Sequence, residues 1–171
     1  GAKSCAYRIG KRVDTDLGAL FSALAGTSTY GSDGQTLTDD ILMAVMQYLD
    51  EGDVPEDDRS IIADPSSKVD LLKIDKFVRN DYVRDGVIAT GKFGNLYNMG
   101  VFITNNLTAA TTGNYGVMMH RDAIGLVIQN APRSQLTKMP GQFRSLFTVD
   151  VIYGLGELQD TFGKSFYTRS L

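Results

Sequence analysis

The sequence has few of the residues that build metal centres and covalent cross-links. Its 171 residues include one cysteine, Cys5, one histidine, His120, and no tryptophan. A single cysteine cannot form an internal disulfide, and one cysteine with one histidine falls short of the four ligands of a structural zinc site. The composition therefore predicts no internal disulfide and no zinc site, and we expect no cofactor. It fits a protein that is made, or assembled into a particle, in a reducing compartment.

The sequence also lacks a strong charge of one sign and a long apolar run. Its 17 basic and 20 acidic residues give a net charge of −3, which does not favour a dedicated nucleic-acid-binding protein. No run of about 18 apolar residues occurs, so no membrane-spanning helix is expected. The first residues lack the apolar core of a signal peptide, and because the chain begins with Gly1 we expect that an upstream part was removed, replaced or left out.

Apolar residues at helical spacing predict three helices in the first half of the chain. The first covers residues 2–25, and the second runs from about residue 39 to 50. The third begins after Asp64, a candidate N-cap, with Pro65 in its first turn. Between the last two, residues 60–63 form a short apolar run that is typical of a buried strand.

From residue 86 onward, short apolar segments separated by glycines predict β-strands. Within residues 143–153 apolar and polar side chains alternate, which is typical of a strand with one face in water. Gly94 and Gly100 are expected in turns between strands. The expected strands cover residues 86–91, 93–100, 101–106, 115–120, 123–130, 143–153 and an edge strand at 163–171. Helices followed by strands predict an α+β fold.

The residues give little support to catalysis. Gly163, Lys164 and Ser165 match the end of a phosphate-binding loop, but that motif needs a glycine five positions before Gly163, where the sequence has Leu158. An exposed Lys164 beside a glycine turn is the better interpretation. His120 could be oriented by a nearby carboxylate, yet a surface histidine at a strand end is favoured. We therefore predict no catalytic, cofactor-binding or metal-binding residues.

Four segments, in order, resemble sequence motifs of tailed-bacteriophage major capsid proteins with the Hong Kong 97-type fold. TLTDDILMAVMQYLDEGDVPEDDRSIIADPSSKVDLLK combines an apolar helix, a loop with VP and an acidic-Arg step, a strand ending in proline, and a helix with paired leucines. DGVIATGKFGNLYNMGVFITNNL is similar to the family's glycine-rich segment. HRDAIGLVIQ and VDVIYGLGEL are similar to its following strand and its long return strand. The resemblance covers about residues 36–171.

The resemblance implies an α+β Hong Kong 97-like fold with a spine helix, an axial domain of helices around a β-sheet, and a return strand to a peripheral domain. Residues 1–35 would form the spine helix and a connecting loop, 36–141 the axial domain, and 142–171 the return strand and a peripheral-domain strand. The N-terminal arm and extended hairpin loop that precede the spine helix in this family are expected to be absent, so the chain resembles the C-terminal half of such a protein.

The implied function is a structural protein, not an enzyme, that self-assembles into the icosahedral shell around phage double-stranded DNA. The expected partners are copies of itself in pentamers and hexamers, possible scaffolding, portal or decoration proteins, and packaged DNA through weak non-specific contacts, with no membrane. The expected location is the virion capsid, assembled in the host bacterial cytoplasm. Two alternatives stay open: a small α+β hydrolase or transferase with an unmarked site, and a tail-associated binding module.

Charge suggests where copies could meet. The loop from Glu51 to Arg59 carries five acids and one arginine, a match for basic groups at the start of the first helix of a neighbour. The alternative is an exposed loop with no partner. The first helix should also leave an apolar stripe partly uncovered, formed by Ile9, Val13, Leu17 and Phe21. The candidate contact residues are Lys3, Arg8, Lys11, Arg12, Asp57, Asp58 and Arg59.

Overall fold

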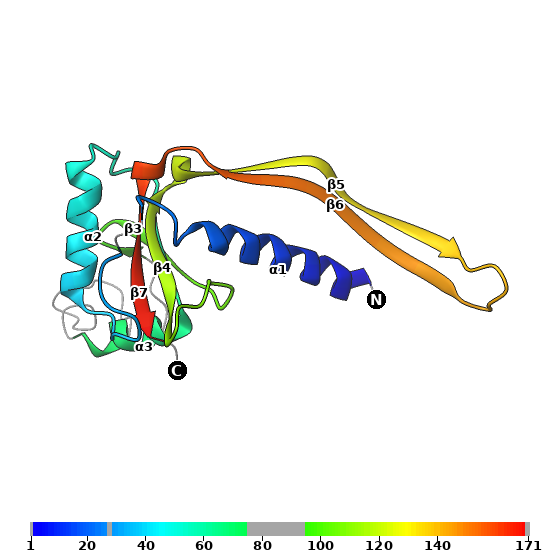
Figure 1. Ribbon diagram of the computed structural model, residues 1–171, viewed down its shortest axis with the longest axis horizontal. Coiled ribbons are helices and arrows are strands. Elements are labelled where there is room, and N and C mark those ends of the chain that lie inside the picture. Colours follow the sequence, from blue (N-terminus) through cyan, green and yellow to red (C-terminus); the bar gives the residue numbers. More distant parts are fainter. Residues whose placement is uncertain (1, 27–28, 75–94, 170–171) are drawn as a thin grey trace.

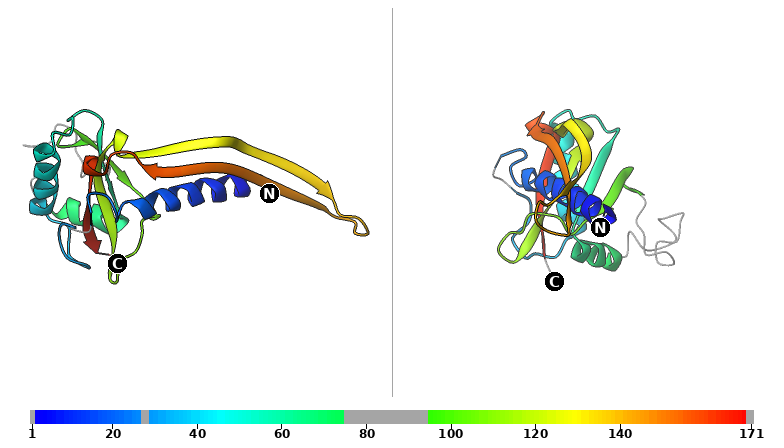
Figure 2. Two further views of the ribbon diagram at one scale, coloured as in Figure 1. Left: turned by 45° about the horizontal axis from the view of Figure 1, so that its top comes forward. Right: turned by 90° about the vertical axis from the view of Figure 1, so that its right-hand side faces the viewer.

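The computed structural model describes residues 2–26, 29–74 and 95–169. The molecule is elongated, with a compact part at one end and an arm that projects from it (Figures 1 and 2). A five-stranded sheet with two helices forms the compact part. One helix and a long β-hairpin lie side by side in the arm, and the hairpin extends beyond the N-terminal end of the helix. Helices and strands combine in an α+β fold, as the sequence predicts.

The sheet of the compact part has the strand order β2-β3-β1-β4-β7. Strands β1 and β3 are parallel, and the other neighbours are antiparallel. Strand β7 lies at the edge, as the sequence predicts. The bounds are Arg59–Ala63 for β1, Asn95–Leu96 for β2, Met99–Ile103 for β3, Gly113–His120 for β4 and Gly163–Arg169 for β7.

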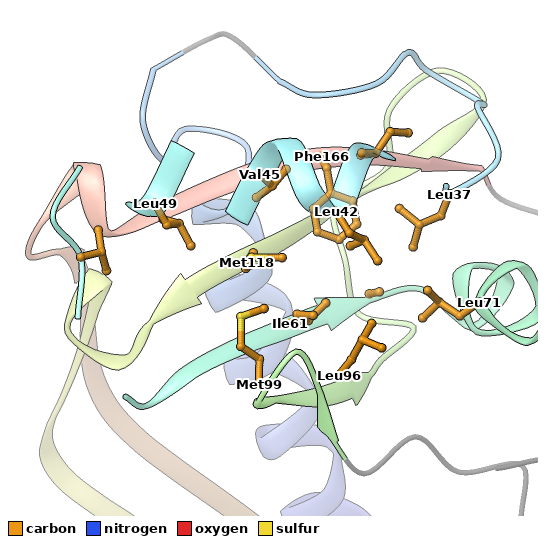
Figure 3. Packing of buried hydrophobic residues seen from close by; sticks show 13 residues of the cluster. Leu37, Leu42, Val45, Leu49, Ile61, Leu71, Leu96, Met99, Met118 and Phe166 are labelled. Atoms are coloured by element: carbon orange, nitrogen blue, oxygen red, sulfur yellow. The ribbon is translucent and has the colours of Figure 1, made fainter. Parts of the chain in front are cut away.

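Helices α2 (Asp39–Glu51) and α3 (Pro65–Lys73) belong to the compact part. The buried face of α2 consists of the apolar residues that predicted the helix, and it meets Met118 of β4 and Phe166 of β7 in the main core (Figure 3). Asp64 precedes α3 in an extended conformation and Pro65 opens it, which confirms the predicted start. The apolar residues of α2 in this core are Ile41, Leu42, Val45 and Leu49.

The arm begins with helix α1 (Ala2–Leu20), which is five residues shorter than predicted. After it the chain turns, and Ala25 and Gly26 both have positive φ angles, so the helix cannot continue to them. Phe21 and Leu24 of this turn are buried against Val117 on the sheet face opposite α2. These two side chains anchor the arm to the compact part.

Strands β5 (Ile124–Lys138) and β6 (Ser145–Glu157) form the hairpin and pair along most of their length, with register shifts around Asn130. The short 3₁₀ helices η1 (Arg121–Ala123) and η2 (Asp160–Phe162) connect the hairpin to the sheet. The hairpin is therefore continuous with β4 at one end and with β7 at the other.

This pairing groups the segments differently from the division expected at residues 141 and 142. That boundary falls in the turn of the hairpin, because β5 pairs with β6 rather than with the sheet, and β7 pairs with β4. Gly100 also differs from expectation: it lies inside β3, and the turn before it is made by Tyr97 and Asn98, which have positive φ angles. The predicted strand at 86–91 and the predicted turn at Gly94 lie outside the described residues.

Candidate functional site

Asp16 of helix α1 accepts two hydrogen bonds, one from the hairpin and one from within the helix. The Tyr153 hydroxyl of β6 donates to Asp16 Oδ2 at 2.6 Å, and Arg12 Nε donates to the same oxygen at 3.1 Å. The hydrogen bond from Tyr153 is the main reason that the pKa of Asp16 lies below its usual value, and it raises the pKa of Tyr153. An ionised Asp16 therefore holds the helix and the strand together at neutral pH.

An apolar cleft of about 480 Å³ opens between α1 and the hairpin. Gly10 lies in its helix wall, and a Cβ atom added there would meet no atom within 4 Å, so the cleft is open at this point. Asp14 is an acidic residue on the same wall. The helix side of the cleft is formed by Ala6, Ile9, Gly10, Val13 and Asp14. The hairpin side of the cleft is formed by Leu126, Ile128, Pro132, Arg133, Ser134, Phe147, Val149, Val151 and Tyr153.

The cleft explains both apolar patterns of the arm. Phe147, Val149, Val151 and Tyr153 all line it, so these four residues share one face of the strand, as their alternation with polar residues predicts. Phe143, the first apolar residue of the predicted strand, is an exception, because β6 begins only at Ser145. In the helix stripe, Ile9, Val13 and Leu17 are half-buried, whereas Phe21 is buried in the compact part. The stripe is thus partly covered by the hairpin and partly open to the cleft.

The tip of the hairpin carries exposed apolar side chains. Met139 and Gln142 close a turn through a backbone hydrogen bond, with Pro140 and a positive-φ Gly141 between them, which is typical of a type II turn. Phe143 follows the turn, and its side chain is fully exposed. The side chains of Leu136 and Leu146 in the adjoining strands are also exposed.

The acidic residues gather around α2. Residues 33–58 contain nine acidic side chains and no basic one. Asp57 is exposed, and Asp58, which has a positive φ, forms an ion pair of 2.9 Å with Arg121. Of the two carboxylates predicted to contact a neighbour, Asp58 therefore already has a partner within the chain.

Arg59 requires a correction, because the structure does not place it on the surface. It is buried, and its guanidinium donates to the carbonyl oxygens of Pro55 and Val54 and to Asp50 Oδ1 at 2.6 Å. These bonds hold the acidic loop in shape. Arg59 is thus a structural residue of its own loop rather than a free charge for a neighbour.

The four basic candidates of α1 lie on exposed positions of the arm. Lys3, Arg8 and Lys11 form no ion pair or side-chain hydrogen bond with a residue that the structure describes. Arg12 forms an exposed pair with Asp16. Because α1 belongs to the arm and α2 lies on the side of the compact part away from the arm, the basic residues of α1 and the acidic residues around α2 are far apart (Figure 1).

His120 and Lys164 are also corrected, since both are buried rather than exposed. The His120 ring packs against Phe162, and its Nδ1 accepts a hydrogen bond from the Asp122 amide at 3.2 Å. Lys164 lies within β7, and its Nζ donates to the Ala25 carbonyl at 2.9 Å and lies 4.6 Å from the Tyr48 ring centre. Burial lowers the pKa of Lys164. Because the residue lies in a strand, it has none of the geometry of a phosphate-binding loop.

An ion pair on the buried carboxylate of Asp70 joins α3 to the edge strand β7. Arg169 of β7 donates to both carboxylate oxygens of Asp70 in α3, at 2.6 Å and 2.9 Å, and the Leu37 amide donates to the same carboxylate. Burial by itself raises the pKa of Asp70, but the bonds from Arg169 and Leu37 outweigh it and leave the pKa below its usual value. This cluster fixes α3 against the edge strand.

The described residues show no cluster of three or more histidine, cysteine or carboxylate side chains that could hold a metal ion. Among the helices that the structure describes, none combines the length and apolar character needed to span a bilayer. The arm cleft and the two clefts beside α2 do not include His120 or Lys164. The two residues with catalytic potential thus line none of these three clefts.

Sequence reasoning did not find the cleft or the Tyr153–Asp16 hydrogen bond. Both depend on the helix and the hairpin lying side by side, although they are more than 100 residues apart in the chain. The sequence shows the apolar stripe of the helix and the alternation in the strand, but it does not show that these two apolar faces lie against each other.

No protein-family model and no curated protein matches this sequence. Solved structures do match it. A structure from Mycobacterium phage Che8 superposes with a TM-score of 0.81 and 17% identity over 96% of this chain and 61% of that chain. The mature capsid of bacteriophage PhiM1 superposes with a TM-score of 0.73 and 16% identity, over 97% of this chain and 63% of that chain. The capsid of cyanophage P-SCSP1u superposes with a TM-score of 0.66 and 18% identity, over 99% of this chain and 64% of that chain.

This chain spans less than two thirds of the length of each of these three proteins. At such low identity the likeness establishes the fold. The chain has the fold of these phage structures, the Hong Kong 97-type fold that its sequence motifs predicted.

Proposed function

We propose that the protein is a structural subunit of a phage capsid, which assembles with copies of itself into an icosahedral shell around double-stranded DNA. The observation that supports this most strongly is the fold, since the capsid structures of two phages match nearly the whole chain. The long arm also supports it, because the hairpin extends beyond α1, where its apolar side chains Leu136, Phe143 and Leu146 are exposed, and a two-stranded hairpin without further packing is only marginally stable in water.

Within this proposal the compact part would be the axial domain, near the capsomer centre, and α1 with the β5–β6 hairpin would be the peripheral domain. This division follows the strand pairing, in which β5 pairs with β6 and β7 pairs with β4. The shell would be built from pentamers and hexamers, assembled in the bacterial cytoplasm. Scaffolding, portal or decoration proteins would be further partners, and packaged DNA would make weak contacts.

The charge separation supports contacts between unlike ends of neighbouring copies. Lys3, Arg8 and Lys11 on the arm and Asp57 on the acidic loop are exposed and unpaired within the part of the chain that is described. Complementary charges at the rim of an interface mainly guide association and add little to fold stability. An enzymatic role has no comparable support, because the buried His120 and Lys164 each serve the packing of their own chain.

Sedimentation of the purified protein over a concentration series tests the proposal. A shell subunit should produce fast-sedimenting particles of uniform size, whose formation rises steeply with concentration. A species that stays monomeric at every concentration, with or without DNA, would contradict it.

A further inference from the structure

The cleft of the arm and the tip of the hairpin have complementary properties. The cleft is apolar, open and about 480 Å³ in volume. The tip presents Phe143, which is fully exposed, next to Leu136 and Leu146. A fully exposed phenylalanine on a projecting hairpin is costly in water, and an open apolar cleft is the kind of surface that such a side chain fills.

Leu136 of the tip is the cross-strand partner of Phe147 in the cleft wall, but Phe143, at the far end of the same hairpin, cannot fold back into the cleft of its own molecule. The cleft lies between the N-terminal half of α1 and a stretch of the hairpin that reaches outward to Ser134 and Phe147, whereas Phe143 lies beyond this stretch, before the start of β6. The end of the hairpin projects beyond the N-terminal end of α1 (Figure 2). The tip of one copy can therefore reach only the cleft of another copy.

Charges beside the two surfaces are also complementary. Asp14 lies on the helix wall of the cleft, and Arg144 directly follows Phe143. Both are exposed, and neither side chain forms an ion pair or hydrogen bond within the described ranges. Opposite charges at the edge of an apolar contact fix its orientation.

The shape of the tip is fixed before any contact forms. The turn from Met139 to Gln142 has its proline and its positive-φ glycine in the positions that a type II turn requires. A tip that is already in its bound shape loses little conformational freedom on docking.

We propose that the hairpin tip of one copy docks into the arm cleft of a second copy, with Phe143 in the cleft between α1 and β6 and Arg144 beside Asp14. The inference rests on the proposed function as a shell subunit and names one of its contacts. Each copy then offers one tip and one cleft, which is a head-to-tail interface that generates a ring when its rotation closes.

Cysteine cross-linking tests this contact in the assembled protein. Phe143→Cys and Gly10→Cys are combined in a Cys5→Ser background, because a side chain at Gly10 projects into open space in the cleft. Under mild oxidation the double variant should give a ladder of dimers and larger multimers on a non-reducing gel. Each single variant should stay monomeric. Dimers from Phe143→Cys alone would show that tips meet tips, and this would overturn the proposal.

Cross-linking and particle formation are scored separately, so the two proposals can fail independently. Shells without a ladder in the double variant would overturn the tip-to-cleft contact and leave the capsid function intact. A ladder without shells would support the contact and contradict the capsid function. Neither shells nor a ladder would contradict both.

Two further variants test the contact without unfolding the chain. Gly10→Leu fills the cleft and favours the helix, so the melting temperature should stay the same or rise while most particles are lost. Gly10→Ala is the control, because it favours the helix without filling the cleft, and it should keep the particles. Asp14→Arg and Arg144→Asp should each reduce particle yield, and their combination should restore it. Normal yield in Gly10→Leu, or no rescue in the charge swap, would overturn the proposal.

Discussion

The polar side chains buried in the compact part stabilise its packing rather than perform chemistry. Asp70 is the clearest case, because its carboxylate receives the Arg169 guanidinium and the Leu37 amide in a fully buried position. Lys164 and His120 follow the same principle, each with a hydrogen-bond partner and an aromatic ring. Polar groups persist in protein interiors when their hydrogen bonds are satisfied in this way.

Asp70 makes stability depend on pH in a defined direction. Because its pKa in the folded state lies below the ordinary 3.8, the ion pair contributes fully above that pH and is lost as the pH falls through the folded value. We predict that Asp70→Asn lowers the free energy of unfolding at pH 7 by about 3 kcal/mol. The difference from the wild type should shrink towards pH 2.

Urea unfolding at both pH values measures this effect. Asp14→Asn is the control, because Asp14 is exposed and has no ion pair with a described residue, so its replacement should change stability little at either pH. An equal loss for Asp70→Asn at pH 7 and pH 2 would mean that the carboxylate acts through its shape rather than its charge.

At the scale of elements, the close approach of β4 and β7 depends on a glycine. A Cβ atom at Gly113 would lie 1.9 Å from the carbonyl oxygen of Thr168, which is backbone and cannot move aside cheaply. Gly113→Ala should therefore destabilise the protein by about 3 kcal/mol. The same change at Gly154 of β6, where nothing lies within 4 Å, should have little effect. Thermal unfolding of both variants decides the point, and equal melting temperatures would contradict the pairing of β4 with β7.

The attachment of helix α1 to the hairpin depends on the hydrogen bond between Tyr153 and Asp16. Removing the Tyr153 hydroxyl leaves Asp16 with Arg12 alone, and the apolar side of the helix faces an open cleft. We predict that Tyr153→Phe speeds amide hydrogen exchange in residues 2–20 and leaves exchange in α2 unchanged. Faster exchange throughout the chain would indicate a general loss of stability instead of a released helix.

Local patterns in the sequence predicted most of these elements but not how they combine. The helix of residues 39–51 follows from its apolar spacing, and Asp64 with Pro65 marks the next start. By contrast, Lys164 looks exposed in the sequence because charge normally favours water, and only the fold shows the Ala25 carbonyl and Tyr48 ring that receive it. The cleft could not be predicted, because it requires two segments far apart in the chain to lie together.

On the scale of the whole molecule, separated charges predict that assembly is sensitive to rim mutations. Asp57 is exposed in the acidic loop, so Asp57→Lys should reduce particle yield while the melting temperature stays nearly constant. Glu157→Lys makes the same change in net charge at the base of the arm and should assemble normally. Gradient sedimentation of both variants measures the yield. Equal yields would show that the acidic loop has no basic neighbour.

The central claim is that an elongated subunit with this fold builds a closed shell, and cryo-electron microscopy of particles formed by the protein tests it most directly. The account predicts an icosahedral shell in which the five-stranded sheet lies towards each capsomer axis and the arms contact neighbouring copies. Particles without closed symmetry, or a shell in which the arms project into solvent without touching another copy, would contradict it.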